Sequence, residues 1–507
     1  MVWRTARLAS LGALLGVTAC GALLGIEDVH EGPTPGGGAA GVTSGGAGGL
    51  SATGGNATPG GGSNPTGGHA GASEAGGPDT GGNGGDAEGG ASGSAAGGAG
   101  GAGTTVQGHL IDLWGHRLPN VPVEVGGKQT TTDADGAFSI ANAPAQYDAS
   151  LVVSIDHNGT PYTRAWVFQG LTRRDPTLQI YEALPTKEGP VDILPNNPPA
   201  LTDTRTLTVA MAGPDGDYVN ADTSGAGLDG AFSQWVGPNT TQETAHALIW
   251  QNGADGLPDQ FIAYDAELVG LSSTVTAHAK VSFDLTAKSI AKGTITGTVA
   301  GSDFSARSND VFLRFTSNAV ISLLSDAPTT AGFSYTVPGG LAGASVIFAA
   351  ANGDFHDSFA IAHKDGLLAG ASQINLSIPT PAKALAATGD LNAINAATKF
   401  SFTAGSAGPF VGVFTNDGTD DQLYVVTSKV PFTFPSVVGG KYKLKPGAFY
   451  NLRIETHGTA ASVDAMAGPT GFIDSFAVID SHDAPTGPRT GDGSYTISSS
   501  LALKAAP

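Results

Sequence analysis

Two acidic loops contain the side chains whose types and spacing could bind a metal ion. In the first, Asn252, Asp255 and Asp259 are separated by turn-forming residues, and the second, residues 416–421, reads Asn-Asp-Gly-Thr-Asp-Asp. Such oxygens suit calcium, which accepts about six to eight oxygen ligands in flexible geometry. Either loop alone supplies few ligands, so we favour a solvated turn for each, predict no metal site and keep calcium as the alternative. Calcium is the only cofactor that the sequence suggests.

The motifs of common catalytic sites are missing. The sequence contains no Gly-x-Ser-x-Gly nucleophile motif, no His-Glu-x-x-His zinc motif and no Gly-x-x-x-x-Gly-Lys-[Ser/Thr] phosphate loop. Its histidines lack the spacing of metal ligands, and we expect them to be surface or turn residues. We therefore predict no catalysis and assign no catalytic residue. The histidines in question are His246, His278, His356, His363, His457 and His482.

Tryptophans offer another binding chemistry, because an indole face can stack on a sugar ring. In β-rich proteins a tryptophan is more often buried in the core than exposed for sugar binding, and we favour burial here. The four residues concerned are Trp114, Trp166, Trp235 and Trp250.

The only cysteine, Cys20, lies where an apolar segment gives way to a glycine-rich one. Arg4 and Arg7 precede the apolar residues 8–18, and this order is typical of a secretory signal. The apolar stretch is too short to cross about 30 Å of hydrocarbon as a helix. A lone cysteine forms no intrachain disulfide in an oxidising compartment. We therefore interpret Cys20 as an attachment point.

The tetrad Val17-Thr18-Ala19-Cys20 resembles the lipobox of bacterial lipoproteins. The resemblance implies a signal peptide over residues 1–19 and a diacylglycerol on Cys20. Acyl chains contribute about 0.8 kcal/mol per buried CH₂, so they could hold the chain on a membrane without a spanning helix. A secreted protein with a chance cysteine is the alternative. We expect lipid anchoring at the cell envelope, at the outer membrane or cell surface.

Residues 20–104 are expected to form a disordered tether. From Pro33 to Gly103 the chain is mainly Gly, Ala, Ser and Thr, with no aromatic residue, Lys or Arg. Such a segment has too little apolar surface to offset the entropy of ordering. Its roughly seventy residues give a typical span of about 45 Å. The formal net charge of the chain is -20, which makes nucleic acid a poor partner.

Residues 105–185 show the period-two pattern of half-buried strands. Val121, Val123 and Val125 alternate with other residues, as do Phe138 and Ile140. Short runs divided by turn residues predict a small antiparallel sandwich.

The order of motifs in this segment resembles the carboxypeptidase regulatory-like domain. The resemblance implies a transthyretin-like β-sandwich that serves as an accessory or stalk module. It brings no peptidase activity, because the chain has no His-x-x-Glu pair. Asp133-x-Asp135-Gly136 is interpreted as a hairpin turn rather than a calcium loop. The motifs are Val106-x-Gly108, Asp112-x-x-Gly115, Leu118-Pro119-x-Val121-x-Val123, Thr132-Asp133-x-Asp135-Gly136-x-Phe138-x-Ile140 and Pro144-x-x-Tyr147-Asp148.

Beyond a proline-rich break near residue 198, a weak repeat recurs at residues 259–263, 357–361 and 474–478. Spacings near 100 residues suit whole sandwiches. Chance similarity of short strands, or fewer and larger modules, is the alternative. The predicted fold class is all-β, with tandem antiparallel β-sandwich modules at 105–185, 200–290, 291–380 and 381–507.

These observations together predict an anchored, non-enzymatic envelope protein. Its expected role is structural, adhesive or ligand-binding, and its expected partners are the membrane and either surface polysaccharide or an envelope protein. The alternative is a carbohydrate-binding or carbohydrate-degrading surface lipoprotein, with paired carboxylates from distant strands.

Overall fold

The computed structural model describes residues 104–507 apart from 113–114, 158–159, 182–186, 203, 212–220, 223–227, 236–238, 302–306, 318, 355–357, 406–407, 459 and 470–491. Within that part almost every regular element is a strand, accompanied by helix α1 (Val463–Met466) and the 3₁₀ turn η1 (Val438–Gly440). This confirms the all-β fold class. The predicted signal peptide, Cys20 and the tether up to residue 103 lie outside the described residues. Among the described helices, none has the length and apolarity needed to cross a membrane.

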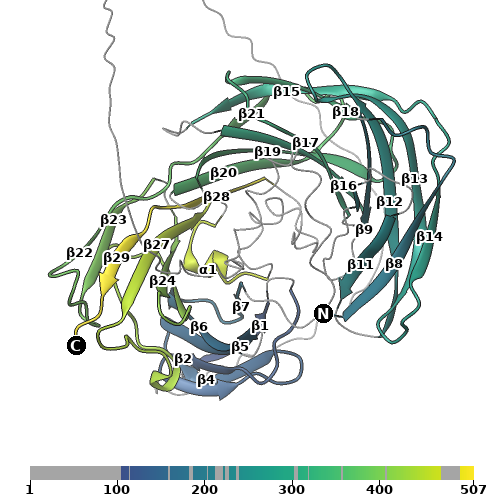
Figure 1. The fold of residues 1–507 in the computed structure, drawn as a ribbon. Coiled ribbons are helices and arrows are strands. Elements are labelled where there is room, and N and C mark those ends of the chain that lie inside the picture. Colours follow the sequence, from purple (N-terminus) through teal and green to yellow (C-terminus); the bar gives the residue numbers. More distant parts are fainter. Residues whose placement is uncertain are drawn as a thin grey trace, which may run out of the picture. The chain divides into compact units, whose positions relative to one another are not determined.

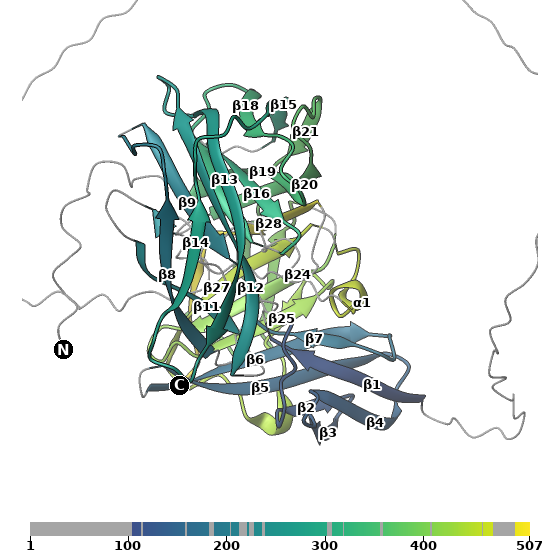
Figure 2. The ribbon, with the colours of Figure 1, turned by 90° about the vertical axis from the view of Figure 1, so that its right-hand side faces the viewer.

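Seven strands at the start of the described chain form two facing groups. They are β1 (Thr104–Ile111), β2 (Pro122–Val125), β3 (Lys128–Thr131), β4 (Ala137–Ala143), β5 (Tyr147–His157), β6 (Thr160–Leu171) and β7 (Thr177–Gln179). One sheet has the order β4-β1-β7, and the other group runs β6-β5-β2-β3 (Figure 2). The predicted alternation is confirmed, because Val121, Val123, Val125, Phe138 and Ile140 are all buried.

The β6-β5-β2-β3 group continues into a much longer sheet of thirteen strands (Figure 1). Its further strands are β16 (Arg307–Phe315), β17 (Val320–Asp326), β19 (Ala344–Asp354), β20 (Ser358–Leu367), β24 (Phe410–Asn416), β25 (Gln422–Thr427), β27 (Phe449–His457), β28 (Gly493–Ile497) and β29 (Leu501–Lys504). The order is β17-β16-β19-β20-β28-β27-β24-β25-β6-β5-β2-β3, and β29 also pairs with β27. Strands from three of the four predicted modules thus share one sheet, and the module boundaries stay a prediction.

Four smaller sheets complete the described chain. The first has the order β10-β9-β12-β13, the second β11-β8-β14, the third β18-β15-β21 and the fourth β22-β23-β26. Their strands are β8 (Lys187–Asn196), β9 (Arg205–Met211), β10 (Ala221–Asp222), β11 (Leu228–Trp235), β12 (Thr240–Asn252), β13 (Pro258–Ser272), β14 (Ala279–Asp284), β15 (Lys292–Ala300), β18 (Gly332–Pro338), β21 (Ile374–Ser377), β22 (Lys383–Ala387), β23 (Lys399–Thr403) and β26 (Phe432–Thr433).

Most pairings between the described strands are antiparallel, as predicted, but four of these pairings are parallel: β1 with β7, β14 with β8, β15 with β21 and β25 with β6. A parallel pair needs a long crossover between its strands. Between β6 and β25 lie 250 residues of chain, and these residues include all the strands of the β10-β9-β12-β13, β11-β8-β14 and β18-β15-β21 sheets.

The apolar residues gather into four buried clusters. The largest joins Trp166 and Phe168 of β6 to Tyr424 of β25, Tyr495 of β28 and Met466 of α1. Side chains from both ends of the described chain therefore share one core, so this core cannot form from the N-terminal segment alone.

Candidate functional site

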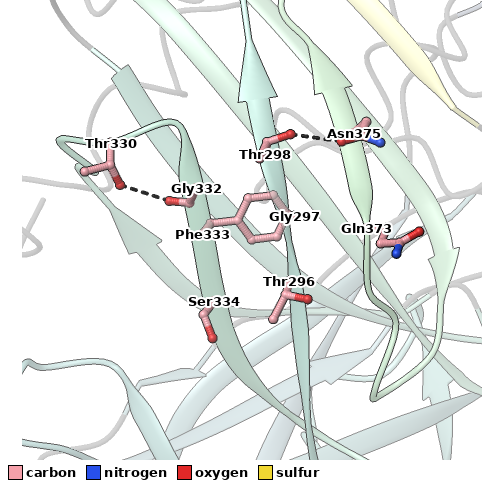
Figure 3. Close-up of a pocket in the computed structure, with 9 residues that line it drawn as sticks. All are labelled: Thr296, Gly297, Thr298, Thr330, Gly332, Phe333, Ser334, Gln373 and Asn375. Atoms are coloured by element: carbon pink, nitrogen blue, oxygen red, sulfur yellow. Dashed lines mark hydrogen bonds between the residues drawn. The ribbon is translucent and has the colours of Figure 1, made fainter. Parts of the chain in front are cut away.

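A groove of about 710 Å³ lies on the β18-β15-β21 sheet (Figure 3). Four of its lining residues have hydroxyl side chains, two have amide side chains, two are glycines and one is aromatic, and none of them is charged. The lining residues are Thr296, Gly297, Thr298, Thr330, Gly332, Phe333, Ser334, Gln373 and Asn375.

Strand alternation decides which side chains face this groove. Ile295 of β15 and the aromatic residues Phe333 and Tyr335 of β18 are buried in a cluster on one face of the sheet. Their neighbours Thr296 and Ser334 must then point to the opposite face, which is solvated. The apolar pattern that fixes the sheet to its core therefore also fixes the polar side that a ligand would meet.

Gly332, which has no side chain, leaves open space in the groove beside Thr298. Gly332 of β18 pairs with Thr298 of β15, and Thr298 pairs on its other side with Asn375 of β21. A Cβ atom placed on Gly332 would come no closer than 3.9 Å to its nearest neighbour, the carbonyl oxygen of Gly297. The space beside Thr298 is consequently open.

Two hydrogen bonds orient the polar groups of the groove. Thr298 Oγ1 donates to Asn375 Oδ1 at 2.9 Å, and Thr330 Oγ1 donates to the carbonyl oxygen of Gly332 at 3.1 Å. Because Asn375 Oδ1 accepts this bond, its Nδ2 points away from Thr298 and can donate to a ligand. The Thr298 hydroxyl oxygen keeps its lone pairs and can accept a hydrogen bond. The groove thus combines donors and acceptors without a formal charge.

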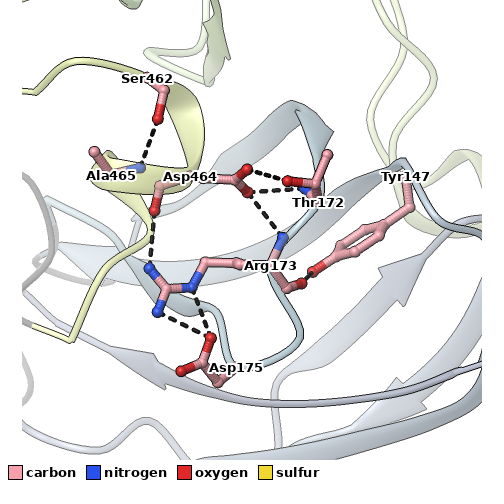
Figure 4. Close-up of polar contacts among 7 residues, drawn as sticks. All are labelled: Tyr147, Thr172, Arg173, Asp175, Ser462, Asp464 and Ala465. Carbon is pink, nitrogen blue, oxygen red and sulfur yellow. Dashed lines mark hydrogen bonds and ion pairs between the residues drawn. The ribbon is translucent and has the colours of Figure 1, made fainter.

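A second feature joins the two ends of the described chain at the end of β6 (Figure 4). Asp464 of α1 accepts hydrogen bonds from the backbone N–H groups of Thr172 at 2.8 Å and Arg173 at 3.0 Å, and from the Thr172 hydroxyl. In return Arg173 Nη1 donates to the carbonyl oxygen of Asp464 at 2.9 Å. Tyr147 supports the turn by donating its hydroxyl to the carbonyl oxygen of Arg173 at 2.5 Å.

The start of β6 is fastened in a similar way. Asp421 Oδ1 accepts the backbone N–H of Thr163 at 2.7 Å, and its Oδ2 lies 2.6 Å from Lys445 Nζ. Arg164 Nη1 also donates to the carbonyl oxygen of Asp420. Between these contacts β6 pairs in parallel with β25. We call β6, β25 and the two carboxylates Asp421 and Asp464 the β6–β25 junction.

The two junction carboxylates have pKa values below the ordinary value of an aspartate, so they stay ionised at a lower pH than a free aspartate does. Burial by itself raises the pKa of Asp464, but the hydrogen bonds from Thr172 and Arg173 outweigh burial and lower the pKa. Burial likewise opposes the shift at Asp421, where Lys445 and the other donors lower the pKa. Charge-assisted hydrogen bonds to backbone N–H groups are among the stronger kind. The junction therefore depends on ionised carboxylates.

The first predicted calcium loop forms a tight turn between β12 and β13. Asp255 Oδ1 accepts the backbone N–H of Leu257 at 3.1 Å, and Asp259 Oδ1 lies 3.0 Å from Lys292 Nζ. Asn252 is the last residue of β12, and its buried Oδ1 has no hydrogen-bond partner among the residues that the structure describes. In the described part of the chain, no group of three or more His, Cys, Asp or Glu side chains is arranged to hold a metal ion. Calcium at Asn252, Asp255 and Asp259 stays the alternative to the predicted solvated turn.

The expectation that the histidines are surface or turn residues is wrong for His246, His363 and His457, which are buried on strands. His246 shows the physical reason. Its Nδ1 lies 3.0 Å from the hydroxyl of Tyr264 and its Nε2 lies 2.7 Å from Ser317 Oγ, so both ring nitrogens are hydrogen-bonded inside the protein. Burial lowers the pKa of His246 to about 4, which keeps the ring neutral at pH 7.

The remaining histidines give a mixed result. His278 is partly exposed, with Nδ1 2.7 Å from Asp192 Oδ1, while His356 and His482 lie outside the described residues. Of the four tryptophans, Trp166 and Trp250 are buried, which confirms the favoured interpretation for these two. Trp114 and the side chain of Trp235 are not among the described parts.

A buried polar cluster escaped the sequence reasoning. The Tyr181 hydroxyl donates to Glu455 Oε2 at 2.8 Å and lies 3.0 Å from His457 Nε2, beneath the stacked rings of Trp166 and Tyr424. Burial raises the pKa of Glu455 to about 7 and lowers that of His457 to about 3. Glu455 and His457 are two residues apart on β27, so their side chains share one face of the strand. This Glu-x-His spacing is the only feature of the sequence that could have indicated the cluster. Because both are at most 9% exposed, we interpret the cluster as part of the core.

Comparison with known proteins leaves the chain without a family. No family model matches it, and no curated protein matches it. Among solved structures, it is similar to the Bacillus anthracis TIE protein, with 10% identity, 54% of this chain and 50% of that chain covered, and a TM-score of 0.14. It is also similar to BcpA, the major pilin subunit of Bacillus cereus, with 10% identity and a TM-score of 0.12, and the match covers 54% of this chain and 99% of BcpA.

A third match is the tetra-tandem repeat in the extending region of a large adhesion protein, with 12% identity, 71% and 96% coverage and a TM-score of 0.12. The chain matches about half the length of the TIE protein. TM-scores this low carry no argument about this chain. The resemblances of residues 17–20 to a lipobox and of residues 105–185 to a carboxypeptidase regulatory-like domain stay predictions.

Proposed function

We propose that this chain is a lipid-anchored, extracytoplasmic protein of the bacterial cell envelope with a structural or adhesive role. Cys20 carries the lipid, residues 20–104 act as the tether, and residues 104–507 form the part that meets other surfaces. The lipobox-like tetrad and the single cysteine support the anchor. The composition of residues 33–103 supports the tether.

The observation that carries the structural role is the β6–β25 junction. A load between the lipid anchor and a bound surface enters the described chain at β1, so the N-terminal strands must be held firmly to the rest of the chain. The parallel pairing of β6 with β25 offers that attachment, and carboxylates fasten it near both ends of β6. A buried aromatic pair, Trp166 and Tyr424, lies across it with ring centroids 4.0 Å apart. Such a junction is suited to a protein that holds two surfaces together.

Carbohydrate binding is the second candidate function, and the groove on the β18-β15-β21 sheet favours it. Catalysis is not part of the proposal: Glu455, whose pKa burial raises to about 7, is enclosed in the core of the described chain. A calcium ion at Asn252, Asp255 and Asp259 would have to compete with Lys292 for the Asp259 carboxylate.

Cys20→Ser tests the anchor in a bacterial host that processes lipoproteins. We expect the wild-type chain in the membrane fraction, with a mature amino terminus at Cys20 whose mass includes the diacylglycerol. The variant is expected to lose most of its membrane association, because no acyl chains remain to be buried. Mass spectrometry of the amino-terminal peptide is the decisive measurement. An unmodified first residue other than cysteine, in protein from the culture fluid, would refute the anchor.

A further inference from the structure

We propose that the groove on the β18-β15-β21 sheet binds a neutral polysaccharide. This inference deepens the proposed function and rests on it, because an envelope protein outside the cytoplasm meets such polymers. The nine lining residues include four hydroxyl side chains and two amide side chains, and none of the nine is charged. A sugar polymer presents hydroxyl groups that both donate and accept, which is the chemistry that this lining matches.

The absence of charge in the lining decides between classes of ligand. The chain as a whole carries a formal charge of -20, so an acidic polymer is repelled at long range. A phosphate or carboxylate placed in the groove would meet no lysine or arginine among the lining residues to pair with it. An apolar ligand would desolvate six polar side chains without replacing their hydrogen bonds, which is costly. A neutral polyhydroxylated ligand meets none of these penalties.

The register of the sheet sets out the polar groups in rows. Thr296 faces Ser334 across one strand pair, and Thr298 lies between Gly332 and Asn375 in the next row. Adjacent strands are about 4.8 Å apart, and alternate residues of one strand are about 6.7 Å apart. A chain of sugar rings can therefore lie on the face and meet a hydroxyl or amide at repeated points.

The groove is held in shape before any ligand arrives. Behind it, Phe333 stacks on Phe348 with ring centroids 4.0 Å apart and on Tyr335 at 5.7 Å. The hydroxyl of Tyr335 donates to Asp326 Oδ2 at 2.7 Å and accepts from Asn309 Nδ2 at 2.9 Å. A site on packed strands loses little freedom on binding. Its volume of about 710 Å³ also lies within the range of about 300–1,000 Å³ that is usual for ligand sites.

Affinity electrophoresis of the purified full chain is the test. The gels contain dextran, galactomannan, hydroxyethyl cellulose or, as the acidic counterpart, alginate. We expect retardation by at least one of the three neutral polymers and none by alginate. If none of the neutral polymers retards the chain, or if alginate retards it more strongly, the proposal is overturned.

Variants locate the binding on the sheet. Thr298→Val keeps the shape of the side chain and removes its hydroxyl, and Asn375→Ala removes the amide that Thr298 orients. Each is expected to weaken retardation about tenfold, the effect of one or two lost hydrogen bonds. Thr294→Val is the matched control, because Thr294 is an exposed residue of the same strand and lies outside the groove lining.

Binding that survives both Thr298→Val and Asn375→Ala, or that falls equally with Thr294→Val, would also overturn the proposal. Ser334→Ala provides a further variant on the neighbouring strand, with an expected loss of about fivefold. Circular dichroism of each variant confirms that the sheet is intact. The Cys20→Ser fractionation tests the anchor separately. If the chain is anchored but binds no neutral polysaccharide, the groove proposal is overturned and the anchor proposal is not.

Discussion

Segments far apart in the sequence meet at two places that use opposite chemistry. At the β6–β25 junction, the ionised carboxylates of Asp421 and Asp464 accept backbone N–H groups. Where β12 meets the turn after β16, a neutral His246 stacks on Phe315 with ring centroids 3.9 Å apart and shares a hydrogen bond with Ser317. One contact needs a charge to be present, and the other needs a charge to be absent.

The comparison teaches that the two contacts fail in different ranges of pH. The pKa of each junction carboxylate lies below its ordinary value of 3.8, so their contribution is complete above that value and is lost only as the pH falls through the lower, folded-state pKa. The pKa of His246 falls from 6.5 to about 4 on burial, so its contribution is lost progressively between pH 6.5 and 4. Mild acid should therefore weaken the His246 contact first.

The largest expected effect comes from truncating the aromatic core on either side of this comparison. Trp166→Ala should lower the free energy of unfolding by about 3–5 kcal/mol, because it leaves a cavity beside Tyr424 and Phe168. Trp250→Ala is the matched variant, since Trp250 is also buried but belongs to the core of β12 and β16. Denaturant unfolding followed by circular dichroism measures both losses.

Hydrogen exchange then shows whether the two regions are separate. Trp166→Ala should speed amide exchange in β6 and β25, and Trp250→Ala should speed it in β9, β12 and β13. If each variant raised the exchange rate equally in both sets of strands, the two regions would not be separate and the comparison would be wrong.

The next effect in size is the acid sensitivity of His246. Because burial lowers the pKa of His246 from 6.5 to about 4, the contact should lose about 3 kcal/mol between pH 6.5 and pH 4. Tyr264, which faces the ring, stays neutral throughout this range, since its ordinary pKa of 10 already lies above the range and burial raises it further, to about 12. His246→Phe should remove this part of the slope when the free energy of unfolding is measured against pH. An unchanged slope would assign the acid sensitivity to other groups, of which buried His457 is the first to examine.

The strands were predictable from the sequence, and their long-range partners were not. Runs such as Val121-x-Val123-x-Val125 announce a half-buried strand through local alternation alone, and all three valines are buried. Nothing local in Gln422–Thr427 indicates that it pairs with Thr160–Leu171. The two strands are separated by 250 residues, whose strands belong partly to this sheet and partly to others. The same limit hid the contact between Asp464 and Thr172, which are 292 residues apart.

The groove was hidden for a different reason. Thr296, Thr298 and Ser334 are ordinary residues for the solvated face of a strand, and no motif separates them from the many other threonines and serines of the chain. They become a possible site only because Gly332 lies opposite Thr298 and because β21, far along the chain, brings Asn375 beside it. The burial of His246 was missed because its hydrogen-bond partner Ser317 comes from a turn 71 residues further along the chain.

The smallest effect sharpens the comparison from the charged side. Asp464→Asn keeps one acceptor oxygen and removes the charge, so it should lower the free energy of unfolding by about 2 kcal/mol through weakened bonds to Thr172 and Arg173. Asp175→Asn is the matched control, since Asp175 also contacts Arg173 but is 74% exposed; it should cost less than about 1 kcal/mol. Denaturant unfolding at pH 7 gives both values. Because the junction carboxylates are ionised well below pH 7, the difference between the two variants should persist at pH 5, where the His246 contact is already weakened. A difference that vanished by pH 5 would mean that Asp464 is not held as an ion, and the contrast between the two contacts would then fail.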